Sequence, residues 1–80
     1  MAKQQLKKSL ILPAFGKRLR ALRLKKGLTP AQFSKATGID KDTLRKYEAG
    51  ESEPKLVAIM TMAKALKISH LDLLPADIGS

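Results

Sequence analysis

The chain has 80 residues, a formal net charge of +9 and no cysteine, which leaves room for one small domain and excludes disulfides and cysteine-ligated metal sites. Hydrophobic residues make up 44% of the chain but aromatic residues only 4%, so we expect an aliphatic core in a helical bundle. One histidine, seven acidic residues and the lack of a glycine-rich phosphate loop give acid–base or metal catalysis almost no basis. We therefore expect a binding protein rather than an enzyme, with no cofactor and no metal.

The positive charge is concentrated at the start of the chain. Residues 1–26 contain nine basic residues and no acidic one, whereas residues 27–80 contain seven of each. Basic residues near phosphates release condensed counterions, so this segment favours a nucleic acid as partner. A membrane surface, an acidic protein or simple solubility would also account for the charge. No apolar run approaches the roughly 20 residues of a membrane-spanning helix, so we expect no membrane partner.

The first predicted helix starts at Ala14 and stops at Gly27. Phe15, Leu19 and Leu22 recur at the spacing of one helix face and would form its apolar side. Gly27 would end the helix, because glycine readily adopts the conformation of a helix terminus.

A strong helix-start signal follows at Thr29. Thr29 is a typical N-cap, Pro30 suits the first helical position, and Gln32 completes a capping box. Gly38 would end this second helix with a left-handed C-cap.

The third predicted helix has Asp40 as its N-cap and ends at Gly50. Its inner side would carry Leu44 and Tyr47. The opposite side would then present a short polar strip suited to a groove, formed by Asp42, Arg45, Lys46 and Ala49.

Two further helices are expected toward the end of the chain. The fourth runs from Pro54 or Lys55 to Leu66, and the fifth is short, starting at Ser69 and closed by Pro75. The inner side of the fourth helix is expected to contain Leu56, Ile59, Met60, Ala63 and Leu66. Its other side is also apolar, so this helix is either central or buried in a partner. Val57, Met60 and Met62 are interpreted as core rather than interface residues.

These elements predict an all-α fold, a compact bundle of four or five short helices. Residues 14–75 would form the domain, residues 1–13 a basic and apolar N-terminal arm, and residues 76–80 a C-terminal tail. Within the arm, residues 8–12 would either pair as a short strand or extend away from the domain.

The second and third helices, separated by a glycine-centred turn, predict a helix-turn-helix. In this motif the first helix supports the second, which enters the major groove of DNA. Ser34 supplies the small residue where the helices cross, Gly38 the bend, and Ile39 the first core anchor after it. Double-stranded DNA is therefore the expected partner.

Many landmarks occur in order along this region: Leu19-Arg-Ala-Leu-Arg23, Gly27-Leu-Thr29, Phe33-Ser34, Gly38-Ile39, Thr43-Leu44, Tyr47-Glu48-Ala49-Gly50, Pro54, Leu56, Ile59, Ala63-Lys-Ala-Leu66, Ile68-Ser69 and Leu73-Leu74. On these residues the segment 15–74 resembles the phage-repressor (Cro-like, xenobiotic-response-element) helix-turn-helix family of transcription regulators. The resemblance implies a lambda-repressor-like DNA-binding domain. Two positions depart from the family pattern: Pro30 stands where glutamine commonly follows the cap of the second helix, and Lys55 replaces a frequent serine or threonine cap.

The resemblance implies that the start of the third helix contacts base edges. The residues at those positions are Lys41, Asp42, Thr43 and Lys46. Lysine can donate to guanine, Asp42 can accept from cytosine, and Thr43 can touch a thymine methyl, which suits half-sites containing G·C pairs. Stabilisation of the helix dipole accounts for Asp42 equally well.

Phosphate contacts are expected from Thr29, Gln32, Arg45, Lys55, Arg18 and Arg20. For Thr29 and Gln32 the capping role comes first, and a solvated basic face is the alternative for Arg18 and Arg20. The family also implies a structural salt bridge between Arg23 and Glu48.

We expect a homodimer on a palindromic operator, because two half-sites a helical turn apart bind more tightly than one. It would regulate transcription, most simply as a repressor that occupies a promoter in the cytoplasm. Candidate dimer contacts are Leu10, Ile11, Leu12, Leu71, Leu73, Leu74 and Ile78. The alternative is an antitoxin-like or adaptor module whose main partner is a protein, such as a toxin or polymerase, with DNA autoregulation secondary.

Overall fold

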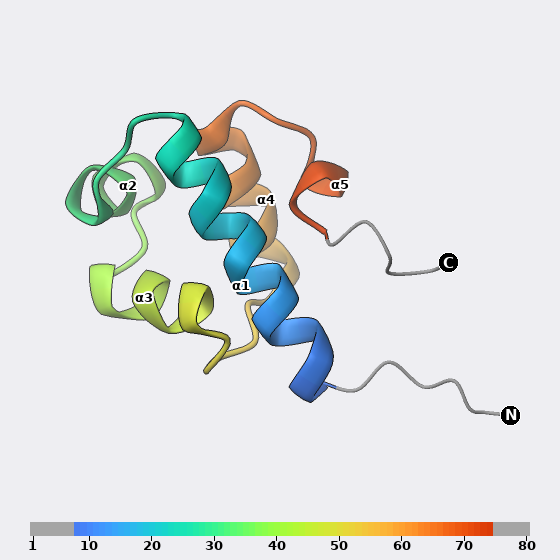
Figure 1. Cartoon of the computed structure of the whole chain (residues 1–80). Helices are drawn as coiled ribbons and strands as arrows, with labels where there is room; N and C mark the ends of the chain where they lie inside the picture. Colours follow the sequence, from blue (N-terminus) through green and yellow to red (C-terminus); the bar gives the residue numbers. More distant parts are fainter. Residues whose placement is uncertain (1–7, 75–80) are drawn as a thin grey trace, which may run out of the picture.

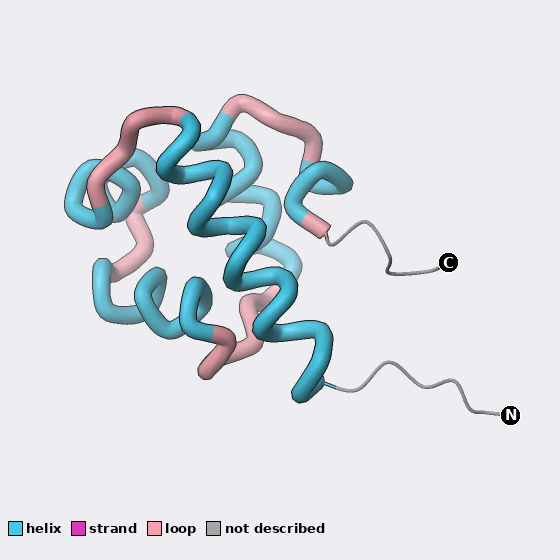
Figure 2. Tube along the Cα trace, viewed as in Figure 1, coloured by secondary structure: helices cyan, strands magenta, loops and turns pink. Residues whose placement is uncertain are grey.

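A computed structural model describes residues 8–74 of the chain, with side chains from residue 10 onward. This part contains the helices α1 (Lys8–Lys25), α2 (Pro30–Thr37), α3 (Lys41–Ala49), α4 (Leu56–Leu66) and α5 (His70–Leu73). Short loops join them, and no strand occurs within residues 8–74 (Figure 2). Figure 1 shows α1 crossing the molecule, with α2 and α3 to one side of it and α5 to the other. The expected all-α bundle is confirmed.

The boundaries of α2 and α3 coincide with capping residues. The Thr29 side chain accepts a hydrogen bond from the backbone N–H of Gln32, and the Asp40 side chain accepts from the first N–H groups of α3. Gly38 and Gly50 follow the two helices with φ of 75° and 76°, a conformation that costs little only for glycine. These local signals hold α2 and α3 to short, well-defined lengths.

The helix α1 starts earlier than the sequence predicted. It begins at Lys8, so residues 8–12 are helical and the expectation of a strand or an extended arm was wrong. Pro13 lies inside the helix, although it has no N–H to donate to the preceding turn. Tertiary packing compensates for this loss, because Ile11 and Leu12 are half-buried against the rest of the bundle.

At the crossing of α1 and the end of α3, only glycine fits. A Cβ atom on Gly16 would collide with the carbonyl oxygen of Glu48 and lie 2.7 Å from that of Tyr47. On the other side of the contact, a Cβ atom on Gly50 would lie 3.0 Å from the Cα of Pro13. The backbones of α1 and α3 therefore touch directly, which determines how far α3 stands from the core.

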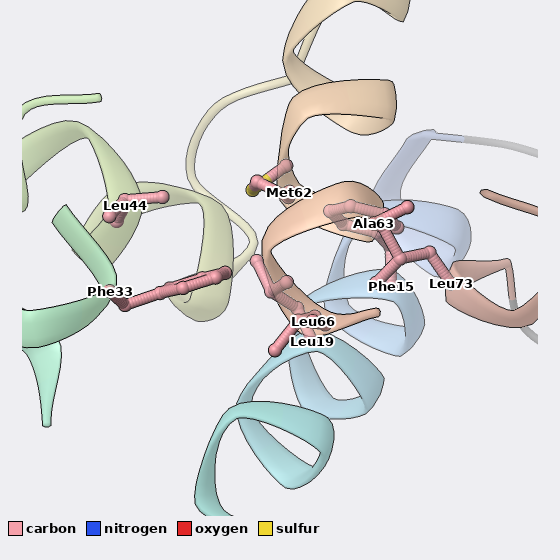
Figure 3. Close-up of a cluster of buried hydrophobic side chains, with 8 residues drawn as sticks. All are labelled: Phe15, Leu19, Phe33, Leu44, Met62, Ala63, Leu66 and Leu73. Atoms are coloured by element: carbon pink, nitrogen blue, oxygen red, sulfur yellow. The ribbon is translucent and has the colours of Figure 1, made fainter. Parts of the chain in front are cut away.

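All five helices contribute to one hydrophobic core. Its buried residues are Phe15, Leu19, Phe33, Leu44, Met62, Ala63, Leu66 and Leu73 (Figure 3). The helices α2 to α5 have 11 residues or fewer and are marginal in isolation, so burial of this cluster is what holds the bundle together.

The inner side of α4 was predicted in part: Ala63 and Leu66 are buried and Ile59 packs against the core as expected, and Met62 is a core residue. Its buried residues are Met62, Ala63 and Leu66, whereas Leu56 and Met60, both expected inside, are 66% and 50% exposed. Val57, interpreted as a core residue, is 77% exposed. A helix that is apolar on all sides gives no direction from which the buried face can be chosen.

Candidate nucleic-acid interface

Hydrogen bonds in the turn join α2 firmly to α3. The Ser34 hydroxyl donates to the carbonyl oxygen of Ile39 over 2.6 Å. The Thr37 hydroxyl donates to the carbonyl oxygen of Phe33 at 2.8 Å and accepts from the N–H of Ile39 at 3.1 Å. The polar groups around the bend at Gly38 are thus paired within the motif, and α3 is carried by α2 as one unit.

The outer side of α3 is open to solvent. Leu44 points into the core, and Tyr47 is half-buried beside it. The exposed residues are Lys41, Asp42, Arg45, Lys46 and Ala49, which include the whole strip predicted from the helical spacing. Thr43 is half-buried, so it lies at the edge of this surface rather than on it.

The charged side chains of the strip are paired with one another. Arg45 Nε lies 3.3 Å from Asp42 Oδ1, and Lys46 Nζ lies 3.6 Å from Asp42 Oδ2. Arg45 Nη2 also lies 3.8 Å from Glu51 Oε1. Asp42 therefore pairs with both neighbouring cations across the face of α3.

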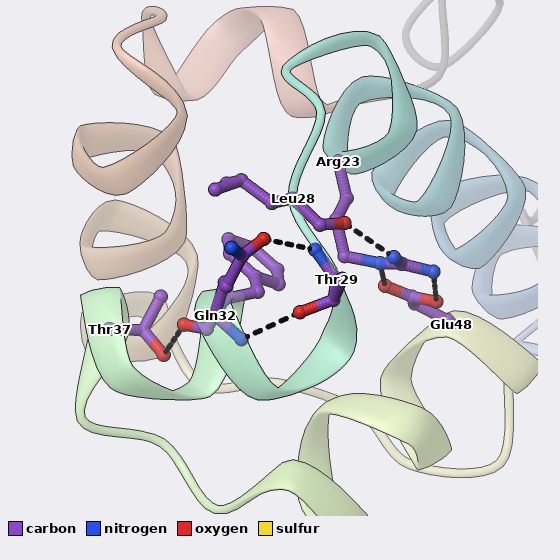
Figure 4. A network of polar contacts seen from close by, with 7 residues as sticks. Arg23, Leu28, Thr29, Gln32, Thr37 and Glu48 are labelled. Atoms are coloured by element: carbon purple, nitrogen blue, oxygen red, sulfur yellow. Dashed lines mark hydrogen bonds and ion pairs between the residues drawn. The ribbon is translucent and has the colours of Figure 1, made fainter.

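A buried ion pair fixes α3 against α1 (Figure 4). Arg23 Nε donates to Glu48 Oε2 at 2.7 Å, and Arg23 Nη2 donates to Glu48 Oε1 at 3.2 Å. Arg23 Nη1 donates to the carbonyl oxygen of Leu28 at 2.8 Å. Arg23 is only 5% exposed, so this one guanidinium group joins α1, α3 and the loop that leads into α2.

Thr29 and Gln32 form a reciprocal capping box at the start of α2 (Figure 4). Gln32 N donates to Thr29 Oγ1 at 3.1 Å, and Thr29 N donates to Gln32 Oε1 at 2.9 Å. Both side chains are exposed, but each already has a structural hydrogen bond.

A hollow of about 470 Å³ lies between the first turn of α2 and the outer side of α3. It is lined by Thr29, Pro30, Ala31, Lys41, Asp42, Arg45 and Glu48. The motif thus presents a concave surface at the place where the two helices meet solvent together. Ala31 was not singled out from the sequence, because an alanine in a first helical turn carries no signal of its own.

The other expected phosphate contacts do not all lie on this side. Arg20 is exposed and, one turn after Gly16, shares the side of α1 that meets α3. Lys55 is exposed at the N-cap position of α4, where its side chain makes no capping hydrogen bond. Arg18 instead donates from Nε to the backbone carbonyl of Asp72 in α5. This contact places Arg18 away from α3 and gives it a structural use.

The candidate dimer residues are divided between surface and interior. Leu73 has no exposed surface and belongs to the core, so its expected role in a dimer contact was wrong. Leu10 and Leu71 are exposed. Three others, Ile11, Leu12 and Leu74, are half-buried around a small hollow; Ile78 lies outside the described residues.

Among residues 8–74, no three histidine or acidic side chains lie close enough together to hold a metal ion. None of the helices in this part of the chain has the length and apolar character needed to span a bilayer.

A supported, solvent-facing second helix beside a capped first helix is the arrangement of a helix-turn-helix DNA-binding protein. The model of the family described as "Helix-turn-helix" matches residues 19–73. The chain belongs to this family, the phage-repressor type of helix-turn-helix transcription regulators, and the expected membership is confirmed.

Known proteins agree with this assignment. The uncharacterized HTH-type transcriptional regulator YazB of Bacillus subtilis is 38% identical over 63 residues, which are 79% of this chain and 91% of that protein. The restriction-modification controller protein C.AhdI of Aeromonas hydrophila superposes with a TM-score of 0.77 at 36% identity, covering 79% of this chain and 96% of its own. The P22 c2 repressor protein, solved in complex with synthetic operator 9T, gives a TM-score of 0.72 at 32% identity, covering 79% of this chain and 96% of its own.

Proposed function

We propose that the chain is a sequence-specific regulator of transcription that binds double-stranded DNA as a homodimer. Each copy would place α3 in the major groove over one half of a palindromic operator, in the cytoplasm, and repress transcription by occupying a promoter. The observation that carries this proposal is the exposed polar strip of α3, which Arg23 and Glu48 hold in one orientation.

Within the strip, Lys41, Asp42 and Lys46 are the proposed readers of base edges. The lysines would donate to guanine O6 and N7, and Asp42 would accept from cytosine N4. Thr43, which is half-buried at the margin, would reach at most a flanking thymine methyl.

The proposed phosphate contacts surround this strip. They come from Arg45, Lys55 and Arg20, which are exposed, and from Thr29 and Gln32 at the N-terminus of α2, where the helix dipole favours an anion. Arg18 is left out because its guanidinium group contacts α5.

Apolar residues on α1 and α5 are the proposed dimer contacts. Leu10 is 67% exposed and Leu71 is 66% exposed, and Ile11, Leu12 and Leu74 lie next to them in half-buried positions. A second copy on this side would leave α3 free for DNA.

The proposal is tested by selecting duplexes from a random pool and measuring their binding at several salt concentrations. We expect a two-fold symmetric motif. Lys46→Ala should weaken binding to it by about 1 to 3 kcal/mol and relax one base position. Lys64→Ala, which removes an exposed lysine of α4, is the matched control and should keep the motif. Equal weakening on all sequences would make Lys46 a phosphate contact, and failure to enrich any motif would refute the proposal.

A second candidate function is protein binding by an antitoxin-like or adaptor module. The exposed apolar residues Leu56, Val57 and Met60 of α4 favour it. A toxin or polymerase bound in stoichiometric amounts, and released by Val57→Asp while DNA binding is kept, would support this function.

A further inference from the structure

We propose that the hollow between α2 and α3 receives the methyl-bearing edge of a thymine, which makes Pro30 and Ala31 determinants of sequence specificity. This inference rests on the proposed function, because it requires α3 to lie in the major groove. It extends the reading of DNA from α3 to the first turn of α2.

The α2 wall of the hollow is apolar where it faces α3. Pro30 and Ala31 line it and are both exposed. Proline has no N–H to offer to a base or a phosphate. The neighbouring Thr29 hydroxyl oxygen already accepts from Gln32 N, and Gln32 Oε1 accepts from Thr29 N. The donors that Thr29 and Gln32 keep are proposed to contact phosphates, whereas the side chains of Pro30 and Ala31 offer an alkyl group a matching apolar surface.

The α3 wall carries charges that select DNA as the occupant. Lys41 and Arg45 line it. Arg45 is paired with Asp42 and Glu51, so Lys41 is the cation whose charge attracts the phosphates of the strand that borders the groove. Asp42 and Glu48 also line the hollow, but Asp42 is paired with Arg45 and Glu48 with Arg23. Lys41 therefore draws a DNA strand onto the rim of the hollow and brings its base edges to the apolar wall.

Thymine is the base whose chemistry fits this wall. It is the only standard base that displays a methyl group in the major groove, at C5. The hollow of about 470 Å³ exceeds the size of one methyl group, so the deoxyribose of the same strand can share it. Contact with Pro30 and Ala31 would remove the methyl from water.

The test removes only this methyl group from the DNA. In the selected duplex, each thymine is replaced singly by deoxyuridine, and affinity is measured at constant salt. We expect one thymine in each half-site at which the replacement weakens binding about fourfold per bound copy, the effect of burying one methyl-sized group. The other thymines, except one near Thr43, should tolerate the change.

A protein variant assigns the effect to its residues. The double variant Pro30→Ser, Ala31→Ser makes the wall polar, and it should bind the thymine and deoxyuridine duplexes equally well at the sensitive position. The matched control is Ala36→Ser, which changes an exposed alanine of α2 that does not line the hollow; it should keep the preference for thymine.

Two outcomes would overturn the inference while leaving the proposed function in place. The first is a duplex bound specifically in which no thymine is sensitive to loss of its methyl. The second is a sensitive thymine whose preference survives the double variant, because another surface would then contact the methyl. Failure to obtain any specific duplex would instead count against the proposed function.

Discussion

Gly16 of α1 lies directly against the backbone carbonyl of Glu48 in α3, with no room for a Cβ atom between them. The same Glu48 holds Arg23, which lies two turns further along α1, through its side chain. The last turn of α3 is therefore held by α1 at two points, one by close backbone contact and one by an ion pair. These contacts act on the inner side of α3 and leave its outer strip free.

Gly16→Ala is expected to lower the free energy of unfolding by about 1 to 3 kcal/mol, because the added methyl forces α1 and α3 apart. Helix propensity alone predicts the opposite sign, a gain of about 1 kcal/mol. Urea unfolding followed by circular dichroism measures the difference. As a control, Ala21→Gly changes an exposed site of α1. It measures the effect of helix propensity alone, away from the contact between α1 and α3. A more stable Gly16→Ala protein would show that the close contact is absent.

Removing either partner of the Arg23–Glu48 pair is expected to lower the free energy of unfolding by about 3 kcal/mol or more, because a mostly buried charge loses its counter-charge. Arg23→Met should cost about 1 kcal/mol more than Glu48→Gln, since the carbonyl of Leu28 also loses its donor. The measurement is urea unfolding of both single variants and the double variant. The double variant should lose clearly less free energy of unfolding than the two single variants lose in sum. Simple additivity of the two losses would mean that the pair contributes no coupling.

The parts of the fold that depend on neighbouring residues were predictable from the sequence. Thr29, Gln32 and Gly38 delimit α2 through contacts within a few residues. Such capping signals can be recognised from the order of residues in the sequence. The outer strip of α3 followed from its inward anchor Leu44 and the helical period. The exposure of this strip was therefore predictable from the sequence, whereas its contact with DNA stays a prediction.

The parts that depend on distant packing were not predictable. Pro13 indicated a break, but α1 continues through it, and Ile11 and Leu12 before it are half-buried. The inward face of α4 was placed only in part, with Leu56 and Met60 wrongly inside, because both sides of the helix are apolar. In the sequence, Arg18 is one of several similar basic residues. Its hydrogen bond to α5 depends on a carbonyl group 54 residues away, which the sequence around Arg18 does not reveal.

Asp42→Asn is expected to increase binding to random duplex and to steepen its salt dependence by about one unit of the logarithmic slope. Without the carboxylate, Arg45 and Lys46 lose the partner they share and become available to phosphates. If Asp42 reads cytosine, affinity for the selected duplex should rise less than affinity for random DNA. The measurement is a salt titration with both duplexes.

The control for Asp42 is Asp72→Asn, which makes the same change in net charge at an exposed position of α5. It should leave the salt dependence nearly unchanged. An equal effect of both variants would show that overall charge, and not the pairing on α3, limits non-specific binding.

Lys67→Gly is expected to stabilise the protein by about 0.5 to 1 kcal/mol. Lys67 ends α4 with φ of 59° and is the only residue other than glycine with a positive φ within residues 8–74. Its side chain is exposed, so glycine relieves backbone strain without leaving a gap in the core. Thermal unfolding should show a higher Tm. Lys64→Gly, in the regular part of the same helix, should lower stability by about 1 kcal/mol. A loss of stability in both variants would mean that flexibility of the unfolded chain outweighs relief of the left-handed conformation.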